Sequence, residues 1–171
     1  GKNIETFGPL RPVWQILKPG GSMAGNKVRR FGILTSGGDC PGLNAAIRGV
    51  AKAASGMYGM EIIGINNGYR GLIEADTRRL SPSDFSGILT VGGTILGSSR
   101  EKPFKDRFPQ ADYENAHSQR QRDADEGKDK PEQIKKNVEL LGLDALVVLG
   151  GNGTNTTAHL LAQEGLNVIG L

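Results

Sequence analysis

The chain has 171 residues, of which 21 are basic and 18 acidic, so its formal net charge is +3 at pH 7. This small excess comes without a stripe of Lys and Arg interleaved with aromatic residues, so we expect no nucleic-acid partner. No apolar run approaches the ~20 residues that span a bilayer, and no signal peptide is visible, so we expect no membrane partner. The one cysteine, Cys40, excludes an internal disulfide bond. It fits a reducing compartment, which predicts a cytoplasmic protein.

The first 22 residues read as an addition to the domain that follows, because Met23 comes directly after Gly20-Gly-Ser22. We interpret residues 1–22 as a translated leader before a natural start at Met23, as a fusion tag or scar, or as a genuine disordered arm. Residues 23–171 then form one domain. The chain stops inside a strand-like run at Leu171, from which we expect a reading frame truncated at its C-terminus.

Short apolar runs alternate with helical patterns along the rest of the chain. Four runs are mostly apolar, as in a sheet buried on both faces, and predict strands at 31–35, 61–65, 145–149 and 167–171. Helices are expected along a stripe from Leu43 to Ala54, from Pro131 to Leu141 and from about Asn155 to Glu164. This alternation predicts an α/β fold, a Rossmann-like parallel sheet flanked by helices.

The pattern collapses between Arg100 and Lys130, where charged residues interrupt any apolar face. Such charge runs are usually solvated surface, and we interpret this one so. The alternative is a mobile flap over a binding cleft, because the segment lies between two glycine-rich loops and long loops often act as lids.

Three glycine-rich loops follow or neighbour the expected strand ends: Ser36–Asn44, Gly92–Arg100 and Gly150–Asn155. Glycines let an anion approach backbone N–H groups closely, and a helix that starts after such a loop presents its positive end to phosphate. None of the loops contains a Walker A Gly-Lys-Ser/Thr or a G-x-G-x-x-G dinucleotide motif. The Arg100 guanidinium is suited to bridging phosphate oxygens, the alternative being a surface salt bridge. Together these features predict a phosphate-binding site.

The same loops carry the motifs of a known family. Leu34-Thr-Ser-Gly-Gly-Asp-Cys-Pro-Gly-Leu-Asn-Ala-Ala-Ile-Arg-Gly49 resembles the first phosphate loop of the 6-phosphofructokinase family, and Gly93-Thr-Ile-Leu-Gly-Ser-Ser-Arg100 resembles its second signature. Leu149-Gly-Gly-Asn-Gly-Thr154 resembles the third, usually written with Asp where this chain has Asn152. NAD kinases and lipid kinases share only the third kind of loop. The resemblance makes residues 23–171 the N-terminal part of a phosphofructokinase-like nucleotide-binding domain.

The resemblance implies a role for each matching residue. Gly37 would contact the donor triphosphate, and Arg100 would bridge the phosphates of donor and sugar as the catalytic residue of this chain. The third loop would bind the nucleotide through Gly151, Asn152, Gly153 and Thr154, with Asn152 offering an oxygen to Mg²⁺. The implied reaction transfers the γ-phosphoryl group of ATP to the 1-hydroxyl of fructose 6-phosphate in glycolysis. The implied assembly is a homo-oligomer, a tetramer or a dimer.

The resemblance also bears on the choice of donor. Gly153 favours ATP, because pyrophosphate-using members of the family carry Asp there and its carboxylate would repel the α-phosphate. Asn152 keeps an oxygen ligand for Mg²⁺ but loses the charge of the usual Asp. Asn66 and Asn67 stand where some ATP-using relatives stack an aromatic residue on adenine. A pyrophosphate-dependent phosphofructokinase is therefore the alternative.

The family's catalytic Asp belongs to a loop that would follow Leu171, so we expect no turnover from this chain alone. No other residue is expected to replace that base: we interpret Asp39 as a hydrogen-bonding loop residue and Cys40 as a small filler. Arg48 and Lys52 match an allosteric effector site of some relatives, and we interpret them as an ordinary solvated helix face. A second alternative function is a catalytically silent nucleotide-binding or regulatory module.

Overall fold

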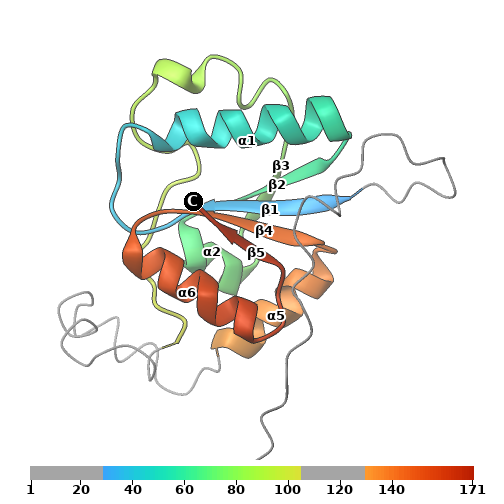
Figure 1. Cartoon of the computed structure of the whole chain (residues 1–171), viewed down its shortest axis with the longest axis vertical. Coiled ribbons are helices and arrows are strands. Elements are labelled where there is room, and N and C mark those ends of the chain that lie inside the picture. Colours follow the sequence, from blue (N-terminus) through green and yellow to red (C-terminus); the bar gives the residue numbers. More distant parts are fainter. Residues whose placement is uncertain (1–28, 105–129) are drawn as a thin grey trace, which may run out of the picture.

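The computed structural model describes residues 29–104 and 130–171, which form a five-stranded sheet with helices on both faces (Figure 1). The strands are β1 Arg30–Thr35, β2 Glu61–Ile65, β3 Thr77–Leu80, β4 Ala145–Leu149 and β5 Val168–Gly170. The helices are α1 Leu43–Tyr58, α2 Gly68–Glu74, α5 Lys130–Leu140 and α6 Asn152–Gln163, with a 3₁₀ turn, η2, at Ile88–Thr90. Residues 1–22 and most of the charged segment after Arg100 lie outside the described residues.

The sheet has the strand order β3-β2-β1-β4-β5, so β1 lies at its centre. β1 pairs in parallel with β2 and with β4, and β4 pairs in parallel with β5. β3 pairs antiparallel with β2, so the expected parallel sheet carries one antiparallel strand at its edge. An antiparallel strand at the edge of an otherwise parallel sheet is common in doubly wound folds.

Each face of the sheet has its own hydrophobic core. Helix α1 covers one face, and α2, α5 and α6 cover the other (Figure 1). Successive side chains of β1 pack on alternate faces of the sheet: Ile33 belongs to the core beneath α1, and Leu34 belongs to the core beneath the other three helices. Such two-sided burial explains why the central strands are continuous apolar runs. Within the described part of the chain, no helix is long and apolar enough to cross a membrane.

The sequence predicts most of these elements, and the α/β fold class is confirmed. The strands expected at 61–65 and 145–149 are confirmed at their bounds. Helix α6 begins at Asn152 and not at Asn155, so part of the third glycine loop is helical. Three elements are absent from the prediction: helix α2, strand β3 and the 3₁₀ turn η2. Helix α2 follows Asn67, which is left-handed with φ 55°, and β3 buries only Leu80.

Candidate functional site

The carboxyl ends of β1 and β4 lie side by side in the middle of the sheet. Thr35, the last residue of β1, is paired with Leu149, the last residue of β4. After β1 the chain enters α1 on one face of the sheet, and after β4 it enters α6 on the other face (Figure 1). The loops after these strands therefore diverge. In an α/β sheet such a switch point is where ligands bind.

The backbone of Ser36 joins the first and third glycine loops. Its N–H donates to the carbonyl oxygen of Leu149 (3.0 Å), and its own carbonyl oxygen accepts a hydrogen bond from Oγ1 of Thr154 (2.9 Å). Thr154 is buried in the first turn of α6. These two bonds hold the start of α6 against the end of β1.

The second glycine loop follows η2 and not a strand. Hydrogen bonds from β1, from the first glycine loop and from α1 hold it beside the other two loops. Oγ1 of Thr35 donates to the carbonyl oxygen of Gly97 (2.6 Å), and the N–H of Gly37 donates to that of Ser99 (2.9 Å). Asn44, buried at the start of α1, accepts a hydrogen bond from the N–H of Ile95 (2.8 Å). All three glycine loops therefore meet at one end of the sheet.

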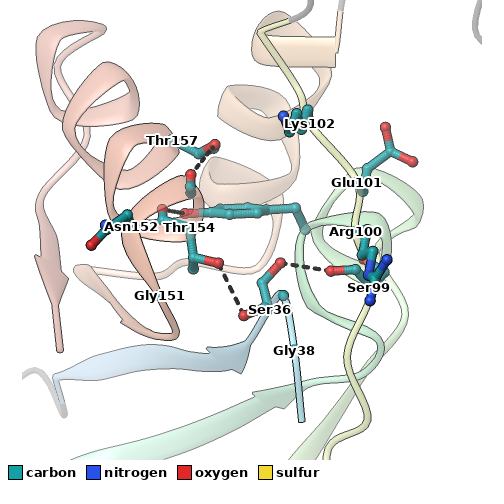
Figure 2. A pocket seen from close by; sticks show the side chains of 13 residues that line it. Ser36, Gly38, Ser99, Arg100, Glu101, Lys102, Gly151, Asn152, Thr154 and Thr157 are labelled. Carbon is teal, nitrogen blue, oxygen red and sulfur yellow. Dashed lines mark hydrogen bonds between the residues drawn. The ribbon is translucent and has the colours of Figure 1, made fainter. Parts of the chain in front are cut away.

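The three loops border a cavity of about 250 Å³. In Figure 2, Asn152, Thr154 and Thr157 of α6 form one wall, and the segment from Ser99 to Lys102 forms the other. The lining residues are Ser36, Gly37, Gly38, Tyr69, Ser99, Arg100, Glu101, Lys102, Gly151, Asn152, Gly153, Thr154 and Thr157. This lining includes every residue that the sequence predicted for the site.

The glycines at this cavity fall into two groups. Gly37 has a φ of +90°, and a Cβ at Gly150 would clash with a backbone oxygen of the first loop, so the fold itself requires glycine at both positions. Gly38, Gly151 and Gly153 differ, because a Cβ there would meet no neighbouring atom of the described residues within 4 Å and none of them has a positive φ. Protein sterics therefore leave glycine unexplained at these three positions, whose open backbone suits the close approach of a ligand.

The charge of the cavity favours an anion. Arg100 is exposed and makes no ion pair with the described residues. Helix α6 starts at the cavity, with no side chain capping its N-terminus and no acidic residue in its first turn. Its first N–H groups lack partners within the helix, and they lie at the positive end of the helix dipole. A phosphate group would accept hydrogen bonds from these N–H groups and would carry the negative charge that the helix dipole favours there.

Tyr69 is a lining residue that sequence reasoning missed. It is buried, and its hydroxyl donates to the carbonyl oxygen of Thr154 (2.8 Å). Burial raises the pKa of Tyr69 well above its usual range, so the phenol remains a donor at neutral pH. Asn66 and Asn67, which stand where some ATP-using relatives stack an aromatic residue on adenine, do not line the cavity, and the Asn66 side chain donates to the Asp76 carboxylate (2.8 Å). An aromatic residue directly after an Asn-Gly turn was the available signal.

Four further residues singled out in the sequence lie outside the cavity lining. Cys40 is exposed, so its interpretation as a small filler was wrong. Asp39 makes no side-chain hydrogen bond with the described residues, which corrects its expected role; its carboxylate lies against Gly93 instead. Lys52 is exposed, as a solvated helix face requires, whereas Arg48 is half-buried and its Nε has no hydrogen-bond partner among the described residues.

The donor set of the cavity suits Mg²⁺ only in company with phosphates. Residues 29–104 and 130–171 contain no group of three or more His, Cys, Asp or Glu side chains that could hold a metal ion. Asn152 lines the cavity and is exposed, so its amide oxygen is available as a ligand. Mg²⁺ commonly takes one or two protein ligands, with substrate phosphates and water completing the shell. The residues present fit an ion that arrives with a phosphate donor.

Comparisons with known proteins agree with this arrangement. Residues 30–171 match the model of a family described as phosphofructokinase. The ATP-dependent 6-phosphofructokinase of Spirochaeta thermophila is 64% identical over 143 residues, which are 84% of this chain and 36% of that protein. Pichia pastoris phosphofructokinase in the T-state has a similar structure, with a TM-score of 0.64 and 33% identity over 87% of this chain and 14% of that one. A pyrophosphate-dependent phosphofructokinase from Marinobacter aquaeolei, 16% identical with a TM-score of 0.62 over 84% of this chain and 32% of that one, is similar in fold alone.

The chain spans about a third of the length of the curated relatives that it matches. The family match nonetheless extends from β1 to β5 and includes all three glycine loops around the cavity. On this match and on the identity to the Spirochaeta thermophila enzyme, the chain belongs to the phosphofructokinase family.

Proposed function

We propose that this chain provides the phosphate-donor side of an ATP-dependent 6-phosphofructokinase, which transfers the γ-phosphoryl group of ATP to the 1-hydroxyl of fructose 6-phosphate in glycolysis. The cavity carries the proposal, because an uncapped helix and three glycines that the fold does not require meet there beside Arg100. The name of the Spirochaeta thermophila relative supports the same activity. Cytoplasmic location and a homo-oligomeric enzyme belong to this proposal.

Positioning and charge stabilisation are the main contributions of the protein, because phosphoryl transfer asks for little covalent chemistry from it. Backbone N–H groups of Gly38, of Gly151 at the N-cap of α6 and of the first turn of α6, which includes Gly153 and Thr154, would hold the donor phosphates. Gly37 would contact the donor without its N–H, which is bonded to the carbonyl oxygen of Ser99. The Arg100 guanidinium would bridge donor and sugar phosphates and neutralise charge on the group being transferred. Mg²⁺, with Asn152 as its protein ligand, would supply further charge neutralisation between the phosphates.

Pyrophosphate is the competing donor, and the size of the cavity is the observation in its favour. At about 250 Å³, the cavity is smaller than the roughly 300–1,000 Å³ typical of small-molecule pockets. The described residues therefore hold a phosphate chain more readily than a whole nucleotide. The open space beside Gly153 favours ATP instead, because no side chain there excludes an α-phosphate.

Calorimetric titration of the 171-residue chain with MgATP and with magnesium pyrophosphate tests the donor site. We expect MgATP to bind, and we expect Arg100→Met to weaken binding by about 10- to 100-fold because it removes charge-assisted hydrogen bonds. Lys135→Met removes a cation of α5 outside the cavity lining and should leave the affinity unchanged. A chain that binds neither donor contradicts the proposal, and a chain that binds only pyrophosphate overturns the choice of ATP.

A chimera tests transfer to the sugar. Residues 30–171 would replace the matching segment of the Spirochaeta thermophila relative, and the product, fructose 1,6-bisphosphate, would be measured with ATP as donor. We expect turnover, and we expect Arg100→Met to abolish most of it. A chimera that folds and binds MgATP without turnover would instead favour a catalytically silent nucleotide-binding module.

A further inference from the structure

Arg100 is held through its two neighbours in the chain, and the first of these is Ser99. The carbonyl oxygen of Ser99 accepts hydrogen bonds from the N–H of Gly37 (2.9 Å) and from Oγ of Ser36 (3.0 Å). Figure 2 shows the bond from Ser36 directly beside Arg100. The first glycine loop therefore fixes the backbone on the N-terminal side of Arg100.

On the other side of Arg100, Glu101 forms a buried ion pair. Its Oε1 lies 2.6 Å from Nζ of Lys130, and the two side chains are only 6% and 8% exposed. The pair joins the wall of the cavity to the first residue of α5. Helix α5 is a firm anchor, because Ile134 is fully buried and the Asn137 side chain donates to two carbonyl oxygens at the end of α2.

The stability of the fold does not account for this pair. Taking both charges out of water offsets most of their attraction, and a well-packed apolar pair often stabilises a fold equally well. Lys130 also places a cation at the positive end of α5, where the helix dipole disfavours it. Glu101 lines the cavity, so we explain the buried ion pair by its effect on a ligand there.

In the cavity, the two charges have complementary effects on a phosphate ligand. An unpaired carboxylate at Glu101 would repel the phosphate groups for which Arg100 is suited. The ammonium group of Lys130 cancels that charge, and the same bond restrains the segment that follows Arg100. We propose that Glu101 and Lys130 are positioning residues, which hold Arg100 at the donor site and keep the cavity favourable to phosphates. The inference rests on the proposed function.

A double-mutant cycle between Glu101 and Arg100, measured on MgATP affinity in the 171-residue chain, tests this inference. Glu101→Gln should weaken binding by about tenfold, as displacement of a binding group implies. In the Arg100→Met background it should weaken binding by less than about twofold, because there is no longer a guanidinium to position. Lys130→Met should weaken binding more than Glu101→Gln does, since it leaves the carboxylate uncompensated beside the phosphates.

The matched control is Glu164→Gln, which removes the carboxylate of another Lys–Glu pair: Glu164, at the C-cap of α6, lies 3.1 Å from Lys135 of α5 and outside the cavity lining. It should leave MgATP affinity unchanged. Urea unfolding checks that each variant is folded. If Glu101→Gln does not fold, Glu101→Asp, which keeps the charge but shortens the side chain, replaces it in the double-mutant cycle.

Equal weakening by the Glu101 variant in both backgrounds, or no weakening in either, overturns the positioning role. A wild-type chain that binds neither MgATP nor pyrophosphate overturns the proposed function itself. The two failures are therefore distinguishable, because the first requires a wild-type chain that binds. Weakening that depends on the presence of Arg100 supports both proposals.

Discussion

Replacing Gly153 by Ala is expected to stabilise the fold and weaken the donor site together. Gly153 is exposed in the first turn of α6, and in the part of the chain that the structure describes a Cβ there would meet no neighbour within 4 Å. Alanine favours the helix and lowers the conformational entropy of the unfolded chain, which stabilises a protein by about 0.4–1 kcal/mol. For a domain of this size, Tm should rise by about 1–4 °C.

The same methyl group would occupy space that the donor needs. A methyl group fills roughly the volume of one water molecule, about 30 Å³, in a cavity of about 250 Å³. Overpacking of this kind costs on the order of 1–3 kcal/mol, which corresponds to weakening of MgATP binding by about 5- to 150-fold. Stability and binding should therefore change in opposite directions.

Thermal unfolding followed by circular dichroism, together with calorimetric titration of MgATP, measures both effects of Gly153→Ala. Gly56→Ala is the matched control, because Gly56 is an exposed glycine in α1 whose Cβ also meets no neighbour within 4 Å, and it does not line the cavity. The control should raise Tm without changing affinity. Wild-type affinity in Gly153→Ala would refute donor occupancy of this space, and a lower Tm would refute the steric argument.

Four further substitutions test the cavity and the pH dependence of stability. Gly150→Ala should destabilise the chain by about 1–3 kcal/mol in urea unfolding, because its Cβ clashes with backbone, whereas Gly151→Ala should unfold like wild type. Tyr69→Phe should cost about 0.5–1.5 kcal/mol in the same assay, because it removes a buried hydrogen bond to the Thr154 carbonyl oxygen of α6. The Ser81 hydroxyl and then the Ser81 N–H hold the pKa of the Asp84 carboxyl below its usual value, so its stabilisation is present above the usual pKa and lost as pH falls through the lowered one. Asp84→Asn should therefore lower stability at neutral pH but not in strong acid, and an equal loss at both would contradict the assignment.

The central strands were predictable from sequence and the antiparallel edge strand β3 was not, for one physical reason. Strands β2 and β4 have both faces covered, so nearly every position is apolar and the run is visible in the sequence. Strand β3 lies at the edge and carries Arg78 and Arg79, which pair with Asp84 and Glu61. A strand whose polar residues find partners only in the folded protein has no apolar signature.

The candidate site was predictable in its residues but not in its assembly. Glycine loops are local features, and the sequence indicates each of them separately. Their meeting depends on contacts between distant residues, such as the bond from Thr154 to Ser36 across 118 positions. Glu101 and Lys130 read as surface charges for the same reason, because only the fold brings them together and buries them.

The glycines of the cavity combine two demands that the sequence alone does not separate. At Gly150, the neighbouring backbone leaves no room for a side chain, so any substitution should reduce stability first and binding as a consequence. At Gly153, the described residues leave room for a side chain, so under the proposed function substitution should reduce binding while stability rises. Opposite changes in stability and binding on Gly153→Ala would therefore separate a glycine kept for a donor from one kept for the fold.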